Sequence, residues 1–171
     1  MRHQGMTALM FAASALLATP TAMAADWQAS ADLHNPDGNL VGEVLIRDTE
    51  HGALLHARLL DLPAGAHAFH IHEKGKCEAP FKSAGGHYNP DGNAHGLDDP
   101  DGRHAGDMPN VHVPSTGKTE VEILNEAVNV GELLDADNGT AIVMHEGPDD
   151  YSSDPAGAAG SRIACGVINE R

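Results

Sequence analysis

The chain has 171 residues, which is enough for one domain with a sizeable core and short for two. Its 25 Asp and Glu residues outnumber its 10 Lys and Arg residues, so the formal net charge is −15 at pH 7. Such an acidic chain is repelled by phosphate backbones and anionic lipids, which argues against non-specific binding to nucleic acids or membrane surfaces. The same charge opposes the approach of any anionic substrate.

The first 24 residues have the pattern of a secretory signal peptide. A basic start at Arg2 precedes an apolar run over residues 6–17, and small residues end at Ala24. We therefore expect residues 1–24 to be removed and residues 25–171 to form a single domain in an exported protein. The apolar run is too short to span a bilayer, and no later run approaches about 20 apolar residues. The mature chain would be soluble, with 9 basic and 25 acidic residues after the loss of Arg2.

Short strand-like segments recur along the chain, whereas helical periodicity is nearly absent. They are apolar or alternate between apolar and polar residues, and turn residues bound them. Only residues 129–138 (NVGELLDADN) indicate a brief helical turn. Many short strands with Gly and Pro between them favour an all-β sandwich or closed barrel. The predicted strands are Gly42–Arg47, Ala53–Leu60, Ala68–His72, Thr119–Ile123, Thr140–His145 and Arg162–Ile168.

Two histidines project from one face of a predicted strand. In Ala68–His72 (AFHIH), residues two apart point to the same side, so His70 and His72 lie side by side on a rigid backbone. A lone histidine of this kind would more simply be a hydrogen-bonded surface residue. The pair, with a histidine-rich segment directly behind it, instead predicts half of a metal site.

The segment over residues 85–107 (GGHYNPDGNAHGLDDPDGRHAGD) contains six Gly, two Pro and five Asp. It cannot bury enough apolar surface to offset the entropy lost when it is ordered. Its three histidines and its last Asp, spaced 8, 9 and 3 residues apart, form a suitable donor set for a tetrahedral zinc site: His87, His95, His104 and Asp107. The alternative, a solvated polar loop, explains the Gly and Asp content but not the histidines. Metal binding would supply the ordering free energy that a core cannot.

The chain has two cysteines, Cys77 and Cys165. In an exported protein, a disulfide between them is favoured over two free thiols. Closing a loop of this length would stabilise the fold by roughly 4 kcal/mol in the chain-entropy model.

Six separated motifs then follow one another in a recognisable order: HAFHIH (67–72), GGHYNP (85–90), HG (95–96), GRHAGD (102–107), MHEGPDD (144–150) and GSRIACGVI (160–168). On these motifs the chain resembles the copper,zinc superoxide dismutases, of the bacterial exported type, over roughly residues 42–168. The resemblance implies an all-β fold, namely an eight-stranded antiparallel Greek-key barrel or sandwich with long metal-binding and active-site loops.

Carried over by position, the resemblance implies one copper and one zinc per subunit. His87 would bind both metals as a bridging imidazolate. The implied copper ligands are His70, His72, His87 and His145, and the implied zinc ligands are His87, His95, His104 and Asp107.

The resemblance also assigns residues around the metals. Asp149 would hydrogen-bond a ligand of each metal and fix their orientation. Arg162 would be the arginine that guides substrate beside the copper. Cys77 and Cys165 would form the disulfide that ties the loop to the barrel. His67 matches a position that packs without binding metal.

The implied activity is the conversion of superoxide to oxygen and hydrogen peroxide by alternating Cu(II)/Cu(I) redox cycling, with a His-bridged structural zinc. Arg162 and His87 would be the catalytic residues, and the location would be the periplasm. No nucleic-acid partner is implied, and no membrane partner after signal cleavage. The bacterial type includes monomers and homodimers, and no interface motif chooses between them here.

The sequence departs from the family pattern near the substrate path. Fewer residues separate His72 from Cys77, and more separate Cys77 from His87, than in the cytosolic eukaryotic enzymes. The segment after MHEGPDD is shorter than the eukaryotic electrostatic loop and carries no Lys. We therefore expect Arg162 to supply the local positive charge, assisted by Lys74, Lys76 or Lys82.

Two other functions stay open at this stage. An exported copper-buffering protein could have the same barrel without turnover, although every ligand position and Arg162 are present here. A barrel stapled by zinc alone would leave three of the histidines without a role: His70, His72 and His145.

Overall fold

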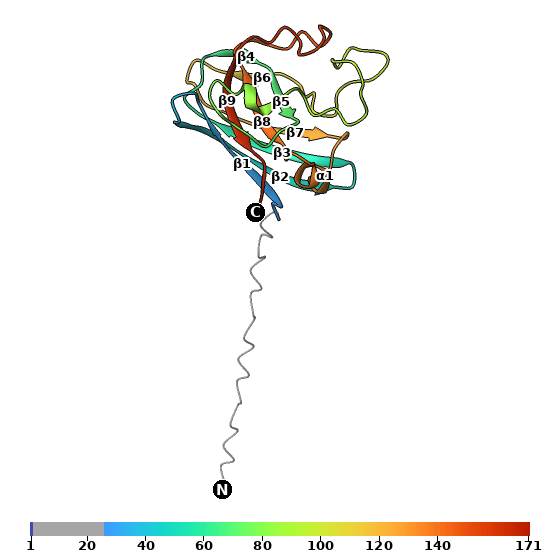
Figure 1. Ribbon diagram of the computed structural model, residues 1–171. Coiled ribbons are helices and arrows are strands. Elements are labelled where there is room, and N and C mark those ends of the chain that lie inside the picture. Colours follow the sequence, from blue (N-terminus) through green and yellow to red (C-terminus); the bar gives the residue numbers. More distant parts are fainter. Residues whose placement is uncertain (2–25) are drawn as a thin grey trace.

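The computed structural model describes residues 26–171 together with Met1, so the predicted signal peptide and its cleavage position lie outside the described residues. Strands dominate this part of the chain, as expected, and they pair in antiparallel fashion (Figure 1). The elements in chain order are β1 (Ala29–His34), β2 (Leu40–Thr49), β3 (Gly52–Leu59), β4 (Gly65–His67), β5 (Phe69–His72), the 3-10 turn η1 (Lys82–Ala84), β6 (Val111–Val113), β7 (Thr119–Asn125), α1 (Val130–Asp135), β8 (Ala141–His145), β9 (Arg162–Val167) and β10 (Asn169–Glu170).

Eight of the ten strands within residues 26–171 form one curled antiparallel sheet in the order β5-β8-β9-β1-β2-β3-β7, with β10 paired to β1. The remaining two, β4 and β6, pair with each other. The all-β prediction is thus confirmed. Four strands were not predicted from the sequence, namely β1, β4, β6 and β10, which are short or contain few β-branched and aromatic residues.

Alternation along the strands places one apolar face inside the curl of the sheet. In β1, Ala29, Ala31 and Leu33 are buried, while the residues between them face outward. β2 and β3 continue this core with Val44, Ile46 and their partners. Each large aliphatic side chain buried in this way contributes about 1.5–3 kcal/mol. The barrel therefore provides a rigid support on which the long loops rest.

A second, smaller apolar cluster lies apart from this core. Phe81 and Ala84, from the segment after β5, pack with Val143 of β8 and Cys165 of β9. This contact holds the segment over residues 77–84 against the sheet, next to the strands that carry His145 and Arg162.

The expected helical turn is present as α1, which is shorter than the predicted range. Asn129 caps it: its side chain accepts a hydrogen bond from the Glu132 backbone N–H, while Glu132 Oε2 accepts one from the Asn129 N–H. No helix within residues 26–171 has the length and apolar character that a membrane crossing requires.

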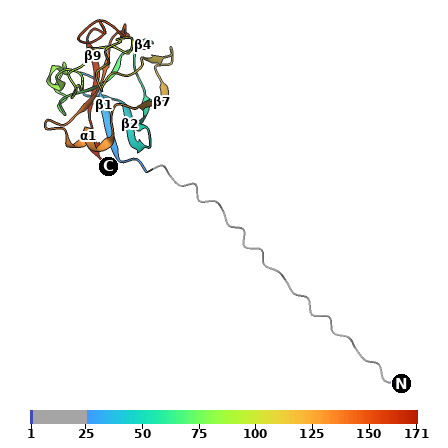
Figure 2. The same ribbon diagram turned by 90° about the vertical axis from the view of Figure 1, so that its right-hand side faces the viewer.

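Two long segments, residues 73–110 and 146–161, contain no strand and lie at the same end of the barrel (Figures 1 and 2). The first segment contacts β5 at Gly106, whose carbonyl oxygen accepts a hydrogen bond from the Ile71 N–H at 3.0 Å. A Cβ at Gly106 would overlap the Ile71 carbonyl oxygen. Only glycine therefore allows this loop to lie so close to the strand.

Replacing Gly106 with Ala should lower the free energy of unfolding by about 1–3 kcal/mol, because the new methyl group forces the loop away from β5. Urea unfolding of the metal-free protein measures the change. Gly147→Ala is the matched control, since a Cβ there meets only an ordinary contact with the Ala159 carbonyl oxygen. Equal stability of the two variants would contradict the close approach.

Candidate metal centre

Two clusters of possible metal ligands occur within the described residues, and they share His87. In each cluster the ligand atoms lie within 4.8 Å of one another, and every member is buried. The structure thus brings together all seven residues that were predicted as ligands. The first cluster is His70, His72, His87 and His145, and the second is His87, His95, His104 and Asp107.

Strand geometry assembles the first cluster. β5 carries His70 and His72 on adjacent same-face positions, and its pairing with β8 brings His145 alongside. His87 joins them through an isolated bridge between its backbone and that of His72. The four imidazoles consequently come from three separate segments that the sheet holds together.

Each histidine of the first cluster has one buried ring nitrogen without a hydrogen-bond partner. These atoms are Nδ1 of His70 and Nε2 of His72, His87 and His145. An unpartnered buried polar atom costs about 1–3 kcal/mol. Four such atoms facing one another within 4.8 Å fit a bound metal ion, which would take all four lone pairs.

The opposite ring nitrogens of three of these histidines face oxygen acceptors. His70 Nε2 donates to Asp149 Oδ2 at 2.8 Å, His72 Nδ1 to the Gly85 carbonyl at 3.1 Å, and His145 Nδ1 to the Gly160 carbonyl at 3.3 Å. A hydrogen on these nitrogens leaves the lone pair on the unpartnered nitrogen. The surrounding oxygens therefore fix the tautomer that metal binding requires.

The second cluster is built around the carboxylate of Asp107. Oδ1 lies 2.7 Å from His87 Nδ1 and 3.3 Å from His104 Nδ1, and Oδ2 lies 3.1 Å from His95 Nδ1. Oδ2 also accepts from the backbone N–H groups of Gly96 and His104. Three nitrogens and one carboxylate, all buried, make a donor set that suits tetrahedral Zn²⁺.

Asp149 connects the clusters from outside. Its Oδ2 accepts from His70 Nε2 of the first cluster, and its Oδ1 accepts from His95 Nε2 of the second at 3.0 Å. The backbone N–H of Tyr151 donates to the same Oδ1 at 2.6 Å. Gly157 packs against this carboxylate so closely that a Cβ would overlap Oδ1. Asp149 thus hydrogen-bonds one residue of each cluster, as the family resemblance implies.

Asn110 and Tyr151 hold Asp149 in place, and sequence reasoning missed both. The side chain of Asn110 pairs with the Asp149 backbone, accepting from its N–H at 2.8 Å and donating to its carbonyl at 2.9 Å. Tyr151 Oη accepts from the Asn110 N–H at 2.9 Å. Asn110 lies only three residues after Asp107, and this proximity was the one signal that could have drawn attention to it.

Arg162 lies beside the first cluster, opposite His145 in the β8–β9 pair. Its two terminal nitrogens each donate at 2.6 Å, Nη1 to the Phe81 carbonyl and Nη2 to the Gly85 carbonyl. The guanidinium is half-buried and makes no ion pair among residues 26–171. Its positive charge is therefore not neutralised by a carboxylate of this part of the chain.

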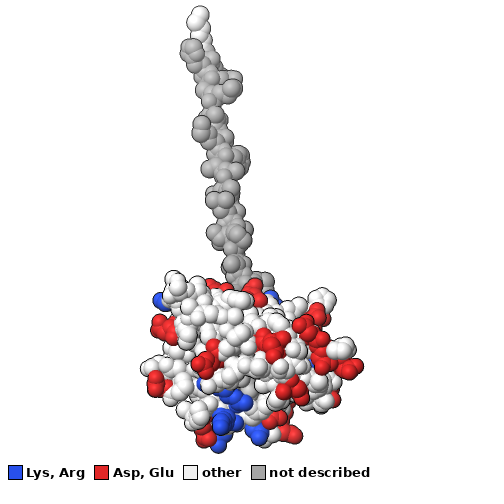
Figure 3. Space-filling view, turned by 90° about the horizontal axis from the view of Figure 1, so that it is seen from above, with Lys and Arg blue, Asp and Glu red and all other residues white. Residues whose placement is uncertain are grey.

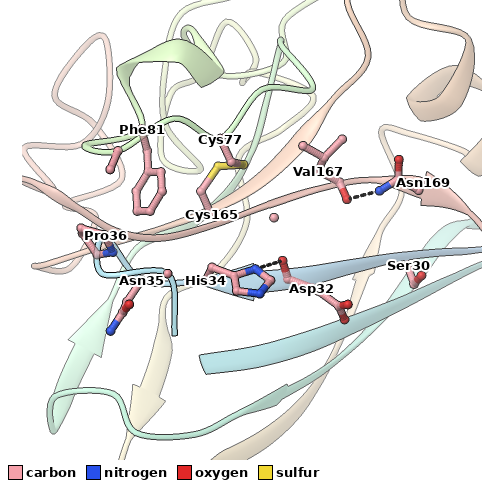
Figure 4. A pocket seen from close by; sticks show the side chains of 13 residues that line it. Ser30, Asp32, His34, Asn35, Pro36, Cys77, Phe81, Cys165, Val167 and Asn169 are labelled. Carbon is pink, nitrogen blue, oxygen red and sulfur yellow. Dashed lines mark hydrogen bonds between the residues drawn. A yellow bond between two sulfur atoms is a disulfide. The ribbon is translucent and has the colours of Figure 1, made fainter. Parts of the chain in front are cut away.

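The predicted disulfide between Cys77 and Cys165 is present and anchors the segment that holds Arg162. Beside it lies a hollow of about 430 Å³ lined by both cysteines, Phe81 and polar residues of β1 such as Asp32 and His34 (Figure 4). None of the seven clustered residues lines this hollow.

The Cys77–Cys165 disulfide also bears on where the protein is located. Disulfides persist in oxidising compartments and are rare in the cytosol, which indicates a non-cytosolic protein.

Burial favours the neutral form of three of the imidazoles, and hydrogen bonds keep the two carboxylates charged. Burial lowers the pKa of His72 well below its usual value, that of His87 to about 4 and that of His145 to about 3. Burial alone would raise the pKa of Asp149, but hydrogen bonds from His70 and the Tyr151 backbone lower it to about 2. Hydrogen bonds from His87 and Gly96 likewise hold the pKa of Asp107 far below its usual range, against the effect of burial. These are the protonation states that metal ligands need.

Fold and site together define a β-barrel metalloprotein with two adjacent metal sites that share one histidine. Residues 40–168 match the family model of copper/zinc superoxide dismutase. A copper-zinc superoxide dismutase of Aquifex aeolicus is 48% identical over 91% of this chain and 95% of its own length, and one of Caulobacter vibrioides is 44% identical over 77% and 80%. The chain belongs to the copper/zinc superoxide dismutase family, whose two metals the clusters fit.

Solved structures agree with this assignment. The copper/zinc superoxide dismutase of Brucella abortus superposes with a TM-score of 0.70 at 29% identity, covering 83% of this chain and all of that one. A superoxide dismutase-like protein of Bacillus subtilis superposes with a TM-score of 0.75 at 37% identity, covering 81% and 96%.

Acid should destabilise the metal-free protein, first through its histidines. A pKa of about 3 or 4 in the folded state, against about 6.5 in the unfolded chain, means that only the unfolded state takes up these protons between pH 6.5 and 4. Each such imidazole should then cost about 1.4 kcal/mol of unfolding free energy per pH unit across this window. Below pH 4 the stability conferred by the two carboxylates is lost in turn, as they become protonated.

Urea unfolding of the metal-free, disulfide-intact protein at pH 7, 6, 5 and 4.5 measures this dependence. A steady fall in stability is expected, and a flat profile would contradict the burial of neutral imidazoles.

Proposed function

We propose that this chain is a periplasmic superoxide dismutase in which residues 1–24 are a cleaved signal peptide and residues 25–171 are the mature domain. In this proposal His70, His72, His87 and His145 hold copper, and His87, His95, His104 and Asp107 hold zinc. The observation that carries the proposal is the four-imidazole cluster whose unpartnered nitrogens face one another beside a second cluster with a carboxylate. Four nitrogen donors suit copper, and three histidines with one Asp suit zinc.

When bound, copper supplies the one-electron oxidation and reduction that dismutation requires, and zinc supplies positive charge without redox chemistry. The chain's own contribution is to orient the ligands and to bury them away from bulk water. Asp149 orients His70 and His95 together through its two oxygens. The Gly85 carbonyl orients His72, and the Gly160 carbonyl orients His145.

His87 is the residue we assign to proton handling. Its Nδ1 faces Asp107 in the second cluster, while its Nε2 is buried and unpartnered in the first. Reduced superoxide needs protons to become hydrogen peroxide, and Nε2 of His87 lies where one can be delivered.

Arg162 is the residue we assign to substrate binding. Two backbone carbonyls accept hydrogen bonds from its guanidinium and hold it beside the first cluster. A positive charge therefore lies next to the proposed copper site, although the protein as a whole is acidic. On the face shown in Figure 3, several Lys and Arg side chains lie close together near one edge, single ones lie elsewhere, and acidic side chains are spread over much of the face. Local positive potential of this kind can attract a small anion despite an unfavourable net charge. Lys74 and Lys82 are further contributors, whereas Lys76 is paired with Glu78 at 3.1 Å.

Arg162→Ala should lower kcat/KM for superoxide at least about tenfold at low ionic strength and flatten its salt dependence, because the local attraction is lost. Pulse radiolysis over a range of salt concentrations measures both. Arg58→Ala removes the same charge from β3, which does not neighbour β5, β8 or β9 in the sheet, and should change little. Equal rates and equal salt slopes for the native protein and Arg162→Ala would rule out this role.

The proposal as a whole is tested on protein purified from a periplasmic extract. We expect a mass that begins at Ala25, close to one copper and one zinc per chain, and rapid superoxide removal by the same sample. Both metals without turnover would instead favour a copper-buffering protein, and zinc alone would favour a structural site. A mass that retains residues 1–24 would contradict the signal peptide.

A further inference from the structure

Glu73 follows directly after His72, and its backbone and side chain bracket a single residue of the neighbouring loop. Its backbone N–H donates to the Gly86 carbonyl at 3.0 Å, and its Oε1 accepts from the Gly86 N–H at 3.0 Å. Both polar backbone groups of Gly86 are therefore held by Glu73. The side chain of Glu73 is exposed, so this pair of hydrogen bonds lies at the surface and not in the core.

The peptide group held in this way begins with the Gly85 carbonyl, which serves two residues of the proposed site at once. Arg162 Nη2 donates to it at 2.6 Å, and His72 Nδ1 donates to it at 3.1 Å. The amide plane joins this carbonyl rigidly to the Gly86 N–H. Fixing the Gly86 N–H therefore fixes the direction of the Gly85 oxygen.

Gly85 itself provides little resistance to rotation. Its backbone angles, φ 74° and ψ −154°, lie in a region that essentially only glycine occupies. A Cβ at this position would overlap the Glu73 carboxylate. Contacts with other residues must therefore fix the conformation of Gly85 and Gly86. The Glu73 side chain makes such a contact with both glycines.

We propose that Glu73 is a positioning residue for the reaction: by holding the Gly86 N–H, it aims the Gly85 carbonyl at both Arg162 and His72. It touches neither substrate nor metal, and it acts through the carbonyl that orients the substrate-binding guanidinium and one copper ligand. This role rests on the function proposed above for Arg162 and His72.

Charge and positioning predict opposite effects when Glu73 is changed. A carboxylate near the path of an anionic substrate repels it, so removal of the charge alone would raise kcat/KM. Loss of the hydrogen bond to Gly86 would instead lower kcat/KM. Glu73→Gln removes the charge and keeps an acceptor oxygen, whereas Glu73→Ala removes both.

We therefore expect kcat/KM of the copper- and zinc-loaded enzyme to fall about tenfold in Glu73→Ala, which is the lower end of the range for partners outside the ligand set. Glu73→Gln should keep the native value or exceed it. Glu146→Ala is the matched control, because Glu146 also follows a proposed copper ligand and its side chain makes no hydrogen bond within residues 26–171. A rise in Glu73→Ala, or equal rates in the Ala and Gln variants, would overturn the proposal.

A second measurement does not depend on turnover. The metal-free, disulfide-intact protein is treated with phenylglyoxal, and modification of Arg162 is followed by mass spectrometry. A guanidinium released from its carbonyl partner should react about fivefold faster in Glu73→Ala, with native rates in Glu73→Gln and Glu146→Ala. Unchanged reactivity in Glu73→Ala, with folding verified by circular dichroism, would overturn the positioning role even if the enzyme is active. If the native protein does not remove superoxide, the proposed function fails, while this reactivity still reports whether Glu73 holds Arg162.

Discussion

Burying a polar nitrogen without a partner costs free energy, and this protein does so at four imidazoles that face one another within 4.8 Å. A fold tolerates such a cost where a bound ligand offsets it. Because His87 also faces Asp107, the same ring belongs to the second cluster. The loop over residues 85–107, which has almost no apolar side chains of its own, is thereby fastened to the barrel at the point where the chemistry takes place.

Strands and loops contribute differently to the two clusters. The strands supply His70, His72, His145 and Arg162, whose backbones cannot shift without breaking the sheet. The loops supply acceptors that set ring orientation, and most of these are backbone carbonyls. Asp149 is the exception, a side chain that reaches both clusters and is itself held by Asn110 and Tyr151. Ligand orientation therefore depends on residues that never approach a metal.

Much of this arrangement could be predicted from the sequence, because it follows from local periodicity. The spacing of His70 and His72 on a strand indicates that both project to one side. Three histidines in a loop of Gly, Pro and Asp indicate metal binding, because such a loop has no apolar core to order it. Which histidines share a site is a different matter. His145 lies far along the chain, and only the family resemblance placed it with His70.

The acceptors that orient the site could not be predicted, for a physical reason. The carbonyls of Phe81, Gly85 and Gly160 carry no residue-specific signal, and their direction depends on backbone angles fixed by distant contacts. Nothing in the sequence distinguishes Asn110 from other loop asparagines, and only the structure shows that its side chain pairs with the Asp149 backbone. β1 escaped prediction because Ala29–His34 is poor in β-branched and aromatic residues, although the sheet pairs it on both sides.

The imidazole of His87 belongs to both clusters, and in the proposed function it joins the two metal sites. Anomalous-difference X-ray crystallography of the copper- and zinc-loaded protein, recorded at the absorption edges of both metals, tests it most directly. We expect a copper peak next to His87 Nε2 and a zinc peak next to His87 Nδ1, one on each side of the same ring. A single peak, or two peaks of which one lies away from His87, would contradict it.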